Sequence, residues 1–335
     1  MNKLIRIGVD TSKHVFQLHG VDAQEKPVLR RQLRRGQMET FFAGLAPTLI
    51  GLEACGASHY WARRLQALGH EVRLVPPQYV KPYVKRGKSD SLDAEAICEA
   101  MSRPTMSFVP VKTVDQQAGA MLLTVRDGLV KQRTALINAI RGHAAEFGVT
   151  VAKGACRVKE LLARAEAELP KLAMGLLASL AGLLEVVEDK LKAIGTELMA
   201  LHRSNALSRR LAGIPGIGPI GAMALVLRVP DPAAFRSARG FAAWTGLTPR
   251  LNGTAGRQRP GHISKAGDET LRRLLVLGAT AMLRRAKAGH SSAWLMGLLA
   301  RKPAKVAAVA LANKLARIAW AMMISGEEYR APSAA

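Results

Sequence analysis

Cysteine and aromatic residues are scarce in this chain of 335 residues. Its three cysteines, Cys55, Cys98 and Cys156, are odd in number and widely spaced. That spacing predicts neither a disulfide framework nor a zinc site, and it fits a reducing compartment. Aromatic residues make up 4% of the chain, so base stacking on an aromatic platform is not the expected mode of nucleic-acid binding.

Acidic residues are also in deficit. The chain holds 49 Lys and Arg against 25 Asp and Glu, which gives a formal charge of +24. Small-metabolite enzymes seldom carry such an excess, so the composition favours a polyanion partner, with nucleic acid first and an anionic membrane surface second. Residues 206–335 hold 20 basic and 5 acidic residues. We therefore expect the main contact with the polyanion there.

Long apolar runs and a secretion signal are missing as well. The N-terminal MNKLIRIGVD lacks an apolar signal core. The longest uncharged stretch, residues 211–227, contains two prolines and four glycines, whereas a membrane helix needs about 20 apolar residues with few breaks. The sequence therefore predicts a cytoplasmic protein without a membrane partner.

The pattern of apolar residues predicts three parts. Residues 1–110 alternate between strands and helices, which indicates an α/β domain with a mixed sheet and flanking helices. Residues 111–205 form a helical connector interrupted near 148–154, and residues 206–335 form a mainly α domain. Within the first part, strands are expected at 4–9, 14–21, 27–33, 48–52 and 72–75, helices at 36–45, 58–68 and 91–101, and a basic loop at 76–88.

Four acidic residues form the strongest chemical pattern. Asp10 and Glu53 each follow an apolar strand, and Asp90 and Asp93 are spaced to share one face of a helix. Carboxylates gathered at one edge of a sheet would repel unless a cation lay between them, and Mg²⁺ is the oxygen-preferring choice. Two such ions about 3.5–4 Å apart would stabilise a phosphodiester during cleavage. The alternative is that these are ordinary helix caps and surface acids.

A glycine-rich turn in the last part is the second pattern. The stretch Ile214-Pro-Gly-Ile-Gly-Pro joins two expected helices and matches a helix-hairpin-helix. Gly216 and Gly218 would expose backbone N–H groups to a phosphate, a contact that is independent of sequence and sensitive to salt. The alternative is a plain turn between helices, where Gly and Pro are common.

A basic, glycine-rich loop over residues 246–268 is the third pattern. It places the hydroxyls of Thr248, Thr254 and Ser264 among four cations, and a hydroxyl beside guanidinium groups could attack a phosphodiester. The alternative is a phosphate-binding loop without a covalent role. The cations are Arg250, Arg257, Arg259 and Lys265.

Taken in order, these motifs resemble the DEDD-type insertion-sequence transposases, a family of bridge-RNA-guided recombinases. IGVDTSK, GLEACG and KSDSLDAEAI match its three N-terminal motifs. IPGIGP, FAAWTGLTPR and GHISKAGDETLRRLLVLGA match its C-terminal transposase domain. The resemblance covers nearly the whole chain.

The resemblance implies an RNase H-like (RuvC-like) N-terminal domain whose Mg²⁺ ligands are Asp10, Glu53, Asp90 and Asp93. It also implies a serine nucleophile in the C-terminal loop, and a composite site shared between subunits of a homo-oligomer, a dimer or a tetramer. A structured guide RNA would pair with donor and target DNA. The protein would then act in a prokaryotic cytoplasm, associated with the nucleoid.

The nucleophile is the point of departure from the family pattern. The matching stretch reads Asn252-Gly-Thr-Ala-Gly and contains no serine, so Thr254 is the only hydroxyl in register. Thr254 replaces the serine, or the covalent step is impaired, or the register differs by one position. Ser264 lies nearby but matches a different part of the motif. Two rival functions stay open: a RuvC-like structure-selective endonuclease that uses water, and a nucleic-acid-binding protein that has lost catalysis.

Overall fold

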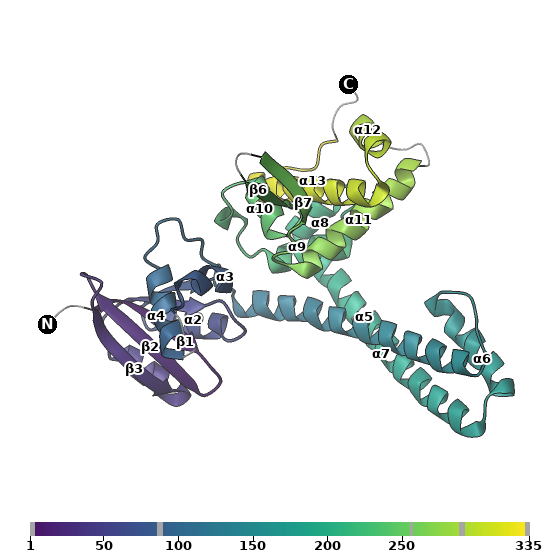
Figure 1. Cartoon of the computed structure of the whole chain (residues 1–335), viewed down its shortest axis with the longest axis horizontal. Coiled ribbons are helices and arrows are strands. Elements are labelled where there is room, and N and C mark those ends of the chain that lie inside the picture. Colours follow the sequence, from purple (N-terminus) through teal and green to yellow (C-terminus); the bar gives the residue numbers. More distant parts are fainter. Residues whose placement is uncertain (1–3, 86–89, 255–256, 288–291, 332–335) are drawn as a thin grey trace. The chain divides into compact units, whose positions relative to one another are not determined.

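The chain folds into two compact units (Figure 1). A computed structural model describes residues 4–85, 90–254, 257–287 and 292–331. Unit 1 comprises Met1–Gln117 together with Pro230–Ala234, and unit 2 comprises Ala118–Val229 and Phe235–Ala335. The predicted division into residues 1–110, 111–205 and 206–335 stays a prediction.

Unit 1 is built on a five-stranded mixed sheet, as its pattern predicts. Its strand order is β3-β2-β1-β4-β5. β1 pairs antiparallel with β2 and parallel with β4, while β2–β3 is antiparallel and β4–β5 is parallel. The strands are β1 (Leu4–Thr11), β2 (Val15–Asp22), β3 (Pro27–Arg34), β4 (Leu49–Glu53) and β5 (Glu71–Val75).

Helices cover both faces of this sheet because residues along each strand alternate between faces. Ile7, Val9, Ile50 and Leu52 are fully buried and pack in one cluster with α1 (Met38–Ala43) and α2 (Ser58–Ala67). The opposite face of β1 and β2 contacts α4 (Asp90–Ala100). The central strands therefore lie between two helical layers.

The segment expected as a loop at residues 76–88 is helical in part. It contains α3 (Pro77–Val80) and the 3₁₀ turn η2 (Lys81–Tyr83), each with a proline in its first turn. Proline is favourable there because that position has no intrahelical N–H partner to lose. The prediction took the prolines and basic residues of this segment to indicate a loop and was wrong for residues 77–83. Residues 86–88 lie outside the described chain. Further 3₁₀ turns are η1 (Arg35–Gln37), η3 (Ala155–Arg157) and η4 (Pro232–Ala234).

Long helices form the first part of unit 2, and the first of them begins at the end of unit 1. α5 (Val114–Glu146) and α7 (Lys171–Ser204) are joined through a shorter helix, α6 (Val158–Glu168). Side chains of all three pack in one cluster that includes Ile140, Leu161 and Leu177. The predicted break near residues 148–154 is therefore followed by a third helix before the second long one begins.

The rest of unit 2 is a helical body around one apolar core. The helix α13 (Ala304–Ser325) lies in that core, with eight buried residues that include Leu311 and Leu315. By length and composition it is the one helix in the described chain that could cross a membrane, and eight of its 22 residues are buried in this core. The helices are α8 (Ala206–Ala212), α9 (Pro219–Arg228), α10 (Ala238–Trp244), α11 (Glu269–Lys287), α12 (Ala293–Arg301) and α13 (Ala304–Ser325).

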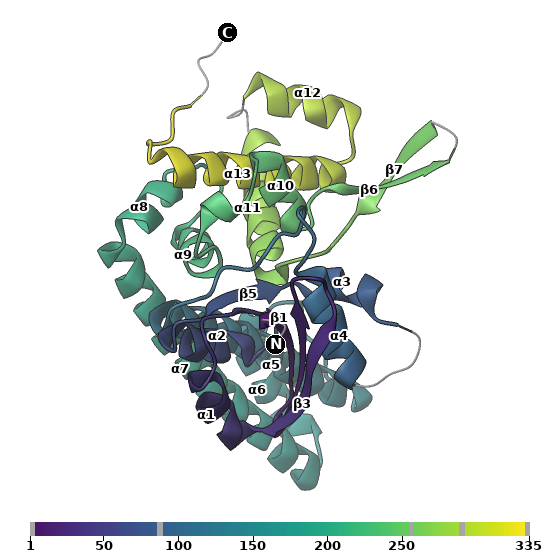
Figure 2. The same ribbon diagram turned by 90° about the vertical axis from the view of Figure 1, so that its left-hand side faces the viewer.

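The expected loop at residues 246–268 is largely a β-hairpin that projects from this body (Figure 2). β6 (Pro249–Thr254) pairs antiparallel with β7 (Arg257–Ile263), with an irregularity near its base. A two-stranded ribbon satisfies backbone groups between its own strands, so polar side chains can stay in water on both faces. Pro260 is tolerated because both strands are edges. Polar composition is therefore compatible with a hairpin, and the prediction of a loop was wrong for residues 249–254 and 257–263.

Two glycines set the distance between α11 and the turn after α8. A Cβ on Gly278 would lie 1.8 Å from the carbonyl oxygen of Gly216, whereas a Cβ on Gly297 of α12 would meet nothing within 4 Å. We expect Gly278→Ala to lower the free energy of unfolding by about 2–3 kcal/mol, because backbone must move to admit the methyl group. Gly297→Ala, the control, should raise it by about 0.5–1 kcal/mol through helix propensity. Urea unfolding of both variants measures the difference, and equal effects would contradict the close contact.

Candidate functional site

Two of the four acidic residues lie side by side at the carboxyl ends of parallel strands. Val9 of β1 pairs with Leu52 of β4, so Asp10 and Glu53 occupy the next position on each strand. β4 ends at Glu53, and β1 ends one residue beyond Asp10, at Thr11. The turn after Glu53 is held by Ser58, whose hydroxyl donates to the Cys55 carbonyl and accepts from the Cys55 N–H.

Two glycines leave room beside these strands, one for α4 and one for the residue that follows it. A Cβ on Gly8 would lie 2.2 Å from the carbonyl oxygen of Ala94 and 2.5 Å from the backbone nitrogen of Cys98, so only glycine admits the helix. A Cβ on Gly51 would likewise meet the end of the Met101 side chain. Since residues two apart share a face of a strand, the carboxylates that follow each glycine face α4.

Neither glycine was singled out in the sequence, although a local signal existed. Each lies inside an apolar strand, two residues before an acid, in Gly8-Val-Asp and Gly51-Leu-Glu. An isolated glycine in a strand often marks a close approach of other backbone. That signal predicts that something packs against the face on which the two acids lie.

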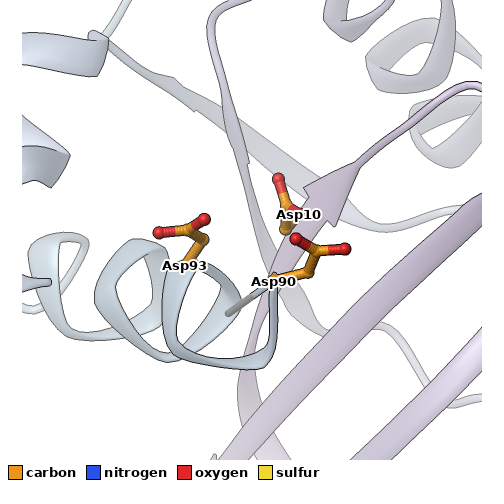
Figure 3. Close-up of side chains that lie close together, drawn as sticks. All are labelled: Asp10, Asp90 and Asp93. Carbon is orange, nitrogen blue, oxygen red and sulfur yellow. The ribbon is translucent and has the colours of Figure 1, made fainter. Parts of the chain in front are cut away.

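Three of the four predicted acids meet at this edge of the sheet (Figure 3). Asp90 and Asp93 lie in the first turn of α4, and one carboxylate oxygen from each of Asp10, Asp90 and Asp93 lies within 4.8 Å of the others. Asp90 is exposed, while the other two are half-buried. Among the described residues, Glu53 does not belong to this tight trio.

The electrostatics of the cluster are those of carboxylates forced together. Burial raises the pKa of Asp10 to about 6, and the charges of Asp93 and Asp90 are the next causes. Burial also raises the pKa of Glu53, followed by the charge of Asp93. Glu53 is therefore coupled to the trio although it stands outside it. A divalent cation fits this set, since every donor is a hard oxygen and its charge would offset the repulsion.

The strand and helix that carry the cluster are also tied together further along. Arg6 of β1 is buried, and its Nε donates to the Cys98 carbonyl of α4 at 2.9 Å. The same guanidinium forms an ion pair with Glu25. At the other end of β1, the Thr11 hydroxyl lies 3.3 Å from the Cys55 thiol beyond β4. These contacts hold β1, β4 and α4 in one arrangement.

The raised pKa of Asp10 predicts how pH changes the stability of the metal-free protein. Its usual pKa is 3.8 and its folded pKa is about 6, so between these values the folded state binds more protons than the unfolded state. Stability from this group therefore falls as pH rises from about 4 to 6, by about 1–2 kcal/mol after solvent screening is allowed for. Urea unfolding with a chelator should show that fall in wild type relative to Asp10→Asn. Parallel curves for the two proteins would contradict the raised pKa.

Gly8 offers a separate test of how α4 is positioned. Gly8→Ala should force α4 away from β1 and lower divalent-cation affinity by about tenfold or more. The reason is that Asp90 and Asp93 on α4 would move away from Asp10, so the carboxylates could no longer surround one ion. Gly51→Ala, the control, meets only a flexible methionine end and should lower affinity much less. Calorimetric titration with Mg²⁺, with circular dichroism to verify folding, measures both. Similar affinities for the two folded variants would refute the positioning role.

The two predicted phosphate-binding glycines lie between α8 and α9, but their surroundings differ. Gly216 has a φ of +91°, and a Cβ on it would lie 2.7 Å from the Met282 sulfur of α11. Close packing therefore accounts for a glycine there. Gly218 caps the N-terminus of α9 and would meet nothing within 4 Å. Of the pair, Gly218 is the one open to a ligand.

The predicted residues of the hairpin lie at its base and near its tip. Arg250 is exposed and donates to the Ser264 carbonyl at 3.1 Å. Lys265 is exposed and has a φ of +54°, uncommon for a residue with a side chain. Thr254 ends β6, opposite Arg257 at the start of β7. The side chains of Thr254, Arg257 and Arg259 lie outside the described part of the structure, as do residues 255–256.

Comparison with known families assigns both ends of the chain. Residues 7–148 match a family described as Transposase, named for the DEDD transposases of IS110 elements. Residues 208–294 match the family described as Transposase IS116/IS110/IS902 family. The first match contains all four acids, and the second contains both glycines and the whole hairpin.

Individual relatives extend the similarity over the full length. The chain is 57% identical over 335 residues to the Sinorhizobium fredii protein that carries the name transposase y4pF/y4sB, which covers 98% of this chain and 87% of that protein. It is 41% identical to the transposase for insertion sequence element IS1111A of Coxiella burnetii, with 97% and 91% covered. It is 39% identical to the transposase for insertion sequence element IS1328 of Yersinia enterocolitica, with 97% and 98% covered.

Proposed function

The chain belongs to the IS116/IS110/IS902 family and is a DNA transposase, and on that premise we propose that it excises and inserts its own element by site-specific recombination. The observation that carries the proposal is the meeting of Asp10, Asp90 and Asp93 at one end of the sheet. Such a cluster suits phosphodiester cleavage, and the basic excess of the chain suits a DNA substrate.

We propose that the trio, with Glu53 beside it, holds Mg²⁺, as two ions in the assembled site. Bound there, the metal supplies Lewis-acid stabilisation of charge on the reacting phosphodiester. The chain's own contribution is to fix the carboxylates before DNA arrives. Gly8 admits α4, and Arg6 anchors that helix to β1. An RNase H-like fold for residues 1–110 accords with the strand order and with the acids at the strand ends.

The C-terminal domain, residues 206–335, is proposed to bind DNA phosphates and to supply the nucleophile. Gly218, at the open turn of the proposed helix-hairpin-helix, contributes N–H groups beside the N-terminus of α9. Gly216 shapes that turn. Arg250, Arg257, Arg259 and Lys265 bind phosphates along the hairpin. The Thr254 hydroxyl attacks the scissile phosphorus, the bond to the leaving 3′ oxygen breaks, and that oxygen takes up a proton.

Three further features complete the proposal. A structured RNA made by the element guides the protein to donor and target DNA. The active form is a homo-oligomer, a dimer or a tetramer, with residues 111–205 as the connector. The protein acts in the cytoplasm at the nucleoid. Light scattering of the purified protein, with and without the element's RNA, tests both the assembly and the RNA.

An excision assay tests the function directly. The protein is expressed with its native element and flanking DNA, and the circular junction that excision leaves is amplified. A junction in the presence of the wild-type protein, absent without it, supports the recombinase. Cleavage of branched DNA without any junction would instead favour the structure-selective endonuclease, which the missing serine at residues 252–256 keeps as second candidate.

A further inference from the structure

A groove of about 1130 Å³ lies at the base of the β6–β7 hairpin, within unit 2. Residues at the base of the hairpin, at the start of α12 and along α13 as far as Arg317 line it. The size slightly exceeds that of a usual small-molecule pocket. The side chains that matter most are Arg250, His262, Lys265, Trp294, Lys305 and Arg317.

Positive charge without compensation is the first property of this groove. Four of its lining residues are Lys or Arg and none is acidic. Some basic residues elsewhere in unit 2 do have an acidic partner, as Arg273 has in Asp127. Within the described chain, no ion pair joins any of the four to a carboxylate, and the buried Nε of Arg317 has no hydrogen-bond partner there. An anionic ligand would supply what the protein does not.

An exposed indole is the second property. Trp294, at the start of α12, is 42% exposed. It lines both this groove and a neighbouring cavity of about 780 Å³, and the Lys314 ammonium lies 4.1 Å from its ring centroid. Lys314 lines only the neighbouring cavity, so the indole stands between the two with its cation partner on the far side. A large aromatic residue left open beside cations is a platform for a base.

A strained backbone is the third property. Lys265 adopts a φ of +54°, a conformation that costs a residue with a Cβ about 1–2 kcal/mol. Hydrogen bonds hold it there: its N–H donates to the Gly246 carbonyl at 3.2 Å, and the Ser264 N–H donates to the Thr248 carbonyl at 2.9 Å. Strain of this kind persists where the surroundings fix it, often at binding sites. It fixes the position of the lysine at the edge of the groove.

We propose that this groove binds an unpaired nucleic-acid strand, with phosphates on Arg250, Lys265, Lys305 and Arg317 and one base stacked on Trp294. In a duplex both faces of every base are covered by its neighbours, so the indole could not be used. In an unpaired strand a base can stack while its flanking phosphates reach the cations. The role rests on the proposed function, because strand exchange exposes such strands, and it adds a specific recognition element to it.

Binding of short oligomers to the full-length protein tests the groove. The probes are labelled unpaired DNA and RNA strands of about twelve nucleotides and a duplex of equal length. Trp294→Ala should weaken binding of the unpaired strand about 5- to 100-fold and leave duplex binding unchanged, whereas Trp294→Phe should retain most of the affinity. Comparing DNA with RNA identifies the strand's source. Met296→Ala is the control, since Met296 is 48% exposed on the same helix and does not line the groove.

A second pair of variants tests the charges. Lys305→Gln should lower the salt dependence of unpaired-strand binding by about 0.7 in the log–log slope, as expected for one lost phosphate contact. Lys302→Gln, the same change at an exposed lysine outside the groove, should not.

Two outcomes would overturn the proposed role of the groove and leave the proposed function of the protein standing. One is equal effects of Trp294→Ala and Met296→Ala, and the other is full competition by polyglutamate, which would indicate an acidic protein partner. In both, duplex binding would still support the proposed function. A wild-type protein that binds neither duplex nor unpaired strands would refute the groove and the proposed function together.

Discussion

Replacing Asp10 by asparagine is expected to abolish excision while making the metal-free protein more stable. The substitution removes one ligand oxygen and one charge from the trio of Asp10, Asp90 and Asp93. Excision should fall at least about 10³-fold, since loss of metal-assisted charge stabilisation costs several kcal/mol of barrier. Quantitative amplification of the circular junction measures the loss.

The gain in stability separates a chemical role from damage to the fold. The carboxylate of Asp10 is held at a raised pKa of about 6 by burial and by its acidic neighbours. Its neutral replacement should therefore raise the free energy of unfolding at pH 7 by about 1–2 kcal/mol, the same amount that wild type loses with rising pH. DNA affinity should stay within about twofold, because phosphate contacts lie elsewhere.

An acid outside the cluster provides the control for this prediction. Asp115 is exposed in the first turn of α5, and Asp115→Asn removes the same charge from the same unit. It should leave excision unchanged. If Asp10→Asn retains excision, or if it loses excision together with stability, the metal-ligand assignment of Asp10 fails.

Thr254→Ala is expected to abolish strand transfer, with a loss of about 10³-fold or more for removal of a nucleophile. Thr254→Ser should retain the activity or raise it, since a serine keeps the hydroxyl without the β-methyl group that restricts rotamer and approach. The two substitutions thus distinguish a covalent role from a role in packing. A covalent protein–DNA adduct, trapped with wild type and absent with Thr254→Ala, is the second measurement.

The other hydroxyls of the hairpin region are the controls for Thr254. Ser264 lies at the base of the hairpin, where its hydroxyl accepts from the Ala266 N–H at 3.4 Å. Ser264→Ala and Thr248→Ala should leave strand transfer largely intact. Strand transfer that survives Thr254→Ala but not Ser264→Ala would move the nucleophile. Cleavage that survives all three changes would identify water as the attacking group and favour the endonuclease.

Local periodicity in the sequence predicted much of the fold of unit 1. Stretches of four to eight residues, apolar or alternating, predicted all five strands of the mixed sheet. Four of these strands contain several buried residues, whereas β3 buries only Leu33. Asp10 and Glu53 could be placed at one edge of the sheet because each directly follows a predicted strand. The helix spacing of Asp90 and Asp93 likewise follows from their separation in the sequence alone.

Contacts between segments far apart in the sequence could not be predicted from local periodicity. One carboxylate oxygen of each residue in the trio lies within 4.8 Å of the others, and Glu53 is outside the trio. This follows because the close contact between Gly8 and α4 determines how near that helix lies to β1. Whether residues 246–268 form a loop or a hairpin depends on backbone pairing, which polar composition does not reveal. Gly216 packs against Gly278 of α11, a contact between distant segments that the motif around Gly216 does not reveal.

The sequence by itself determined the family, the basic excess and the positions of the acids along the chain, since each depends on residue identity and short-range spacing. The tertiary structure alone decided which acids converge and why Gly8 is required. The tertiary structure also decided that Trp294, one of few aromatic residues in this chain, lines the same groove as Arg250 and Arg317. Those residues come from the hairpin, α12 and α13, which line one groove, and no periodicity within any one segment encodes that arrangement.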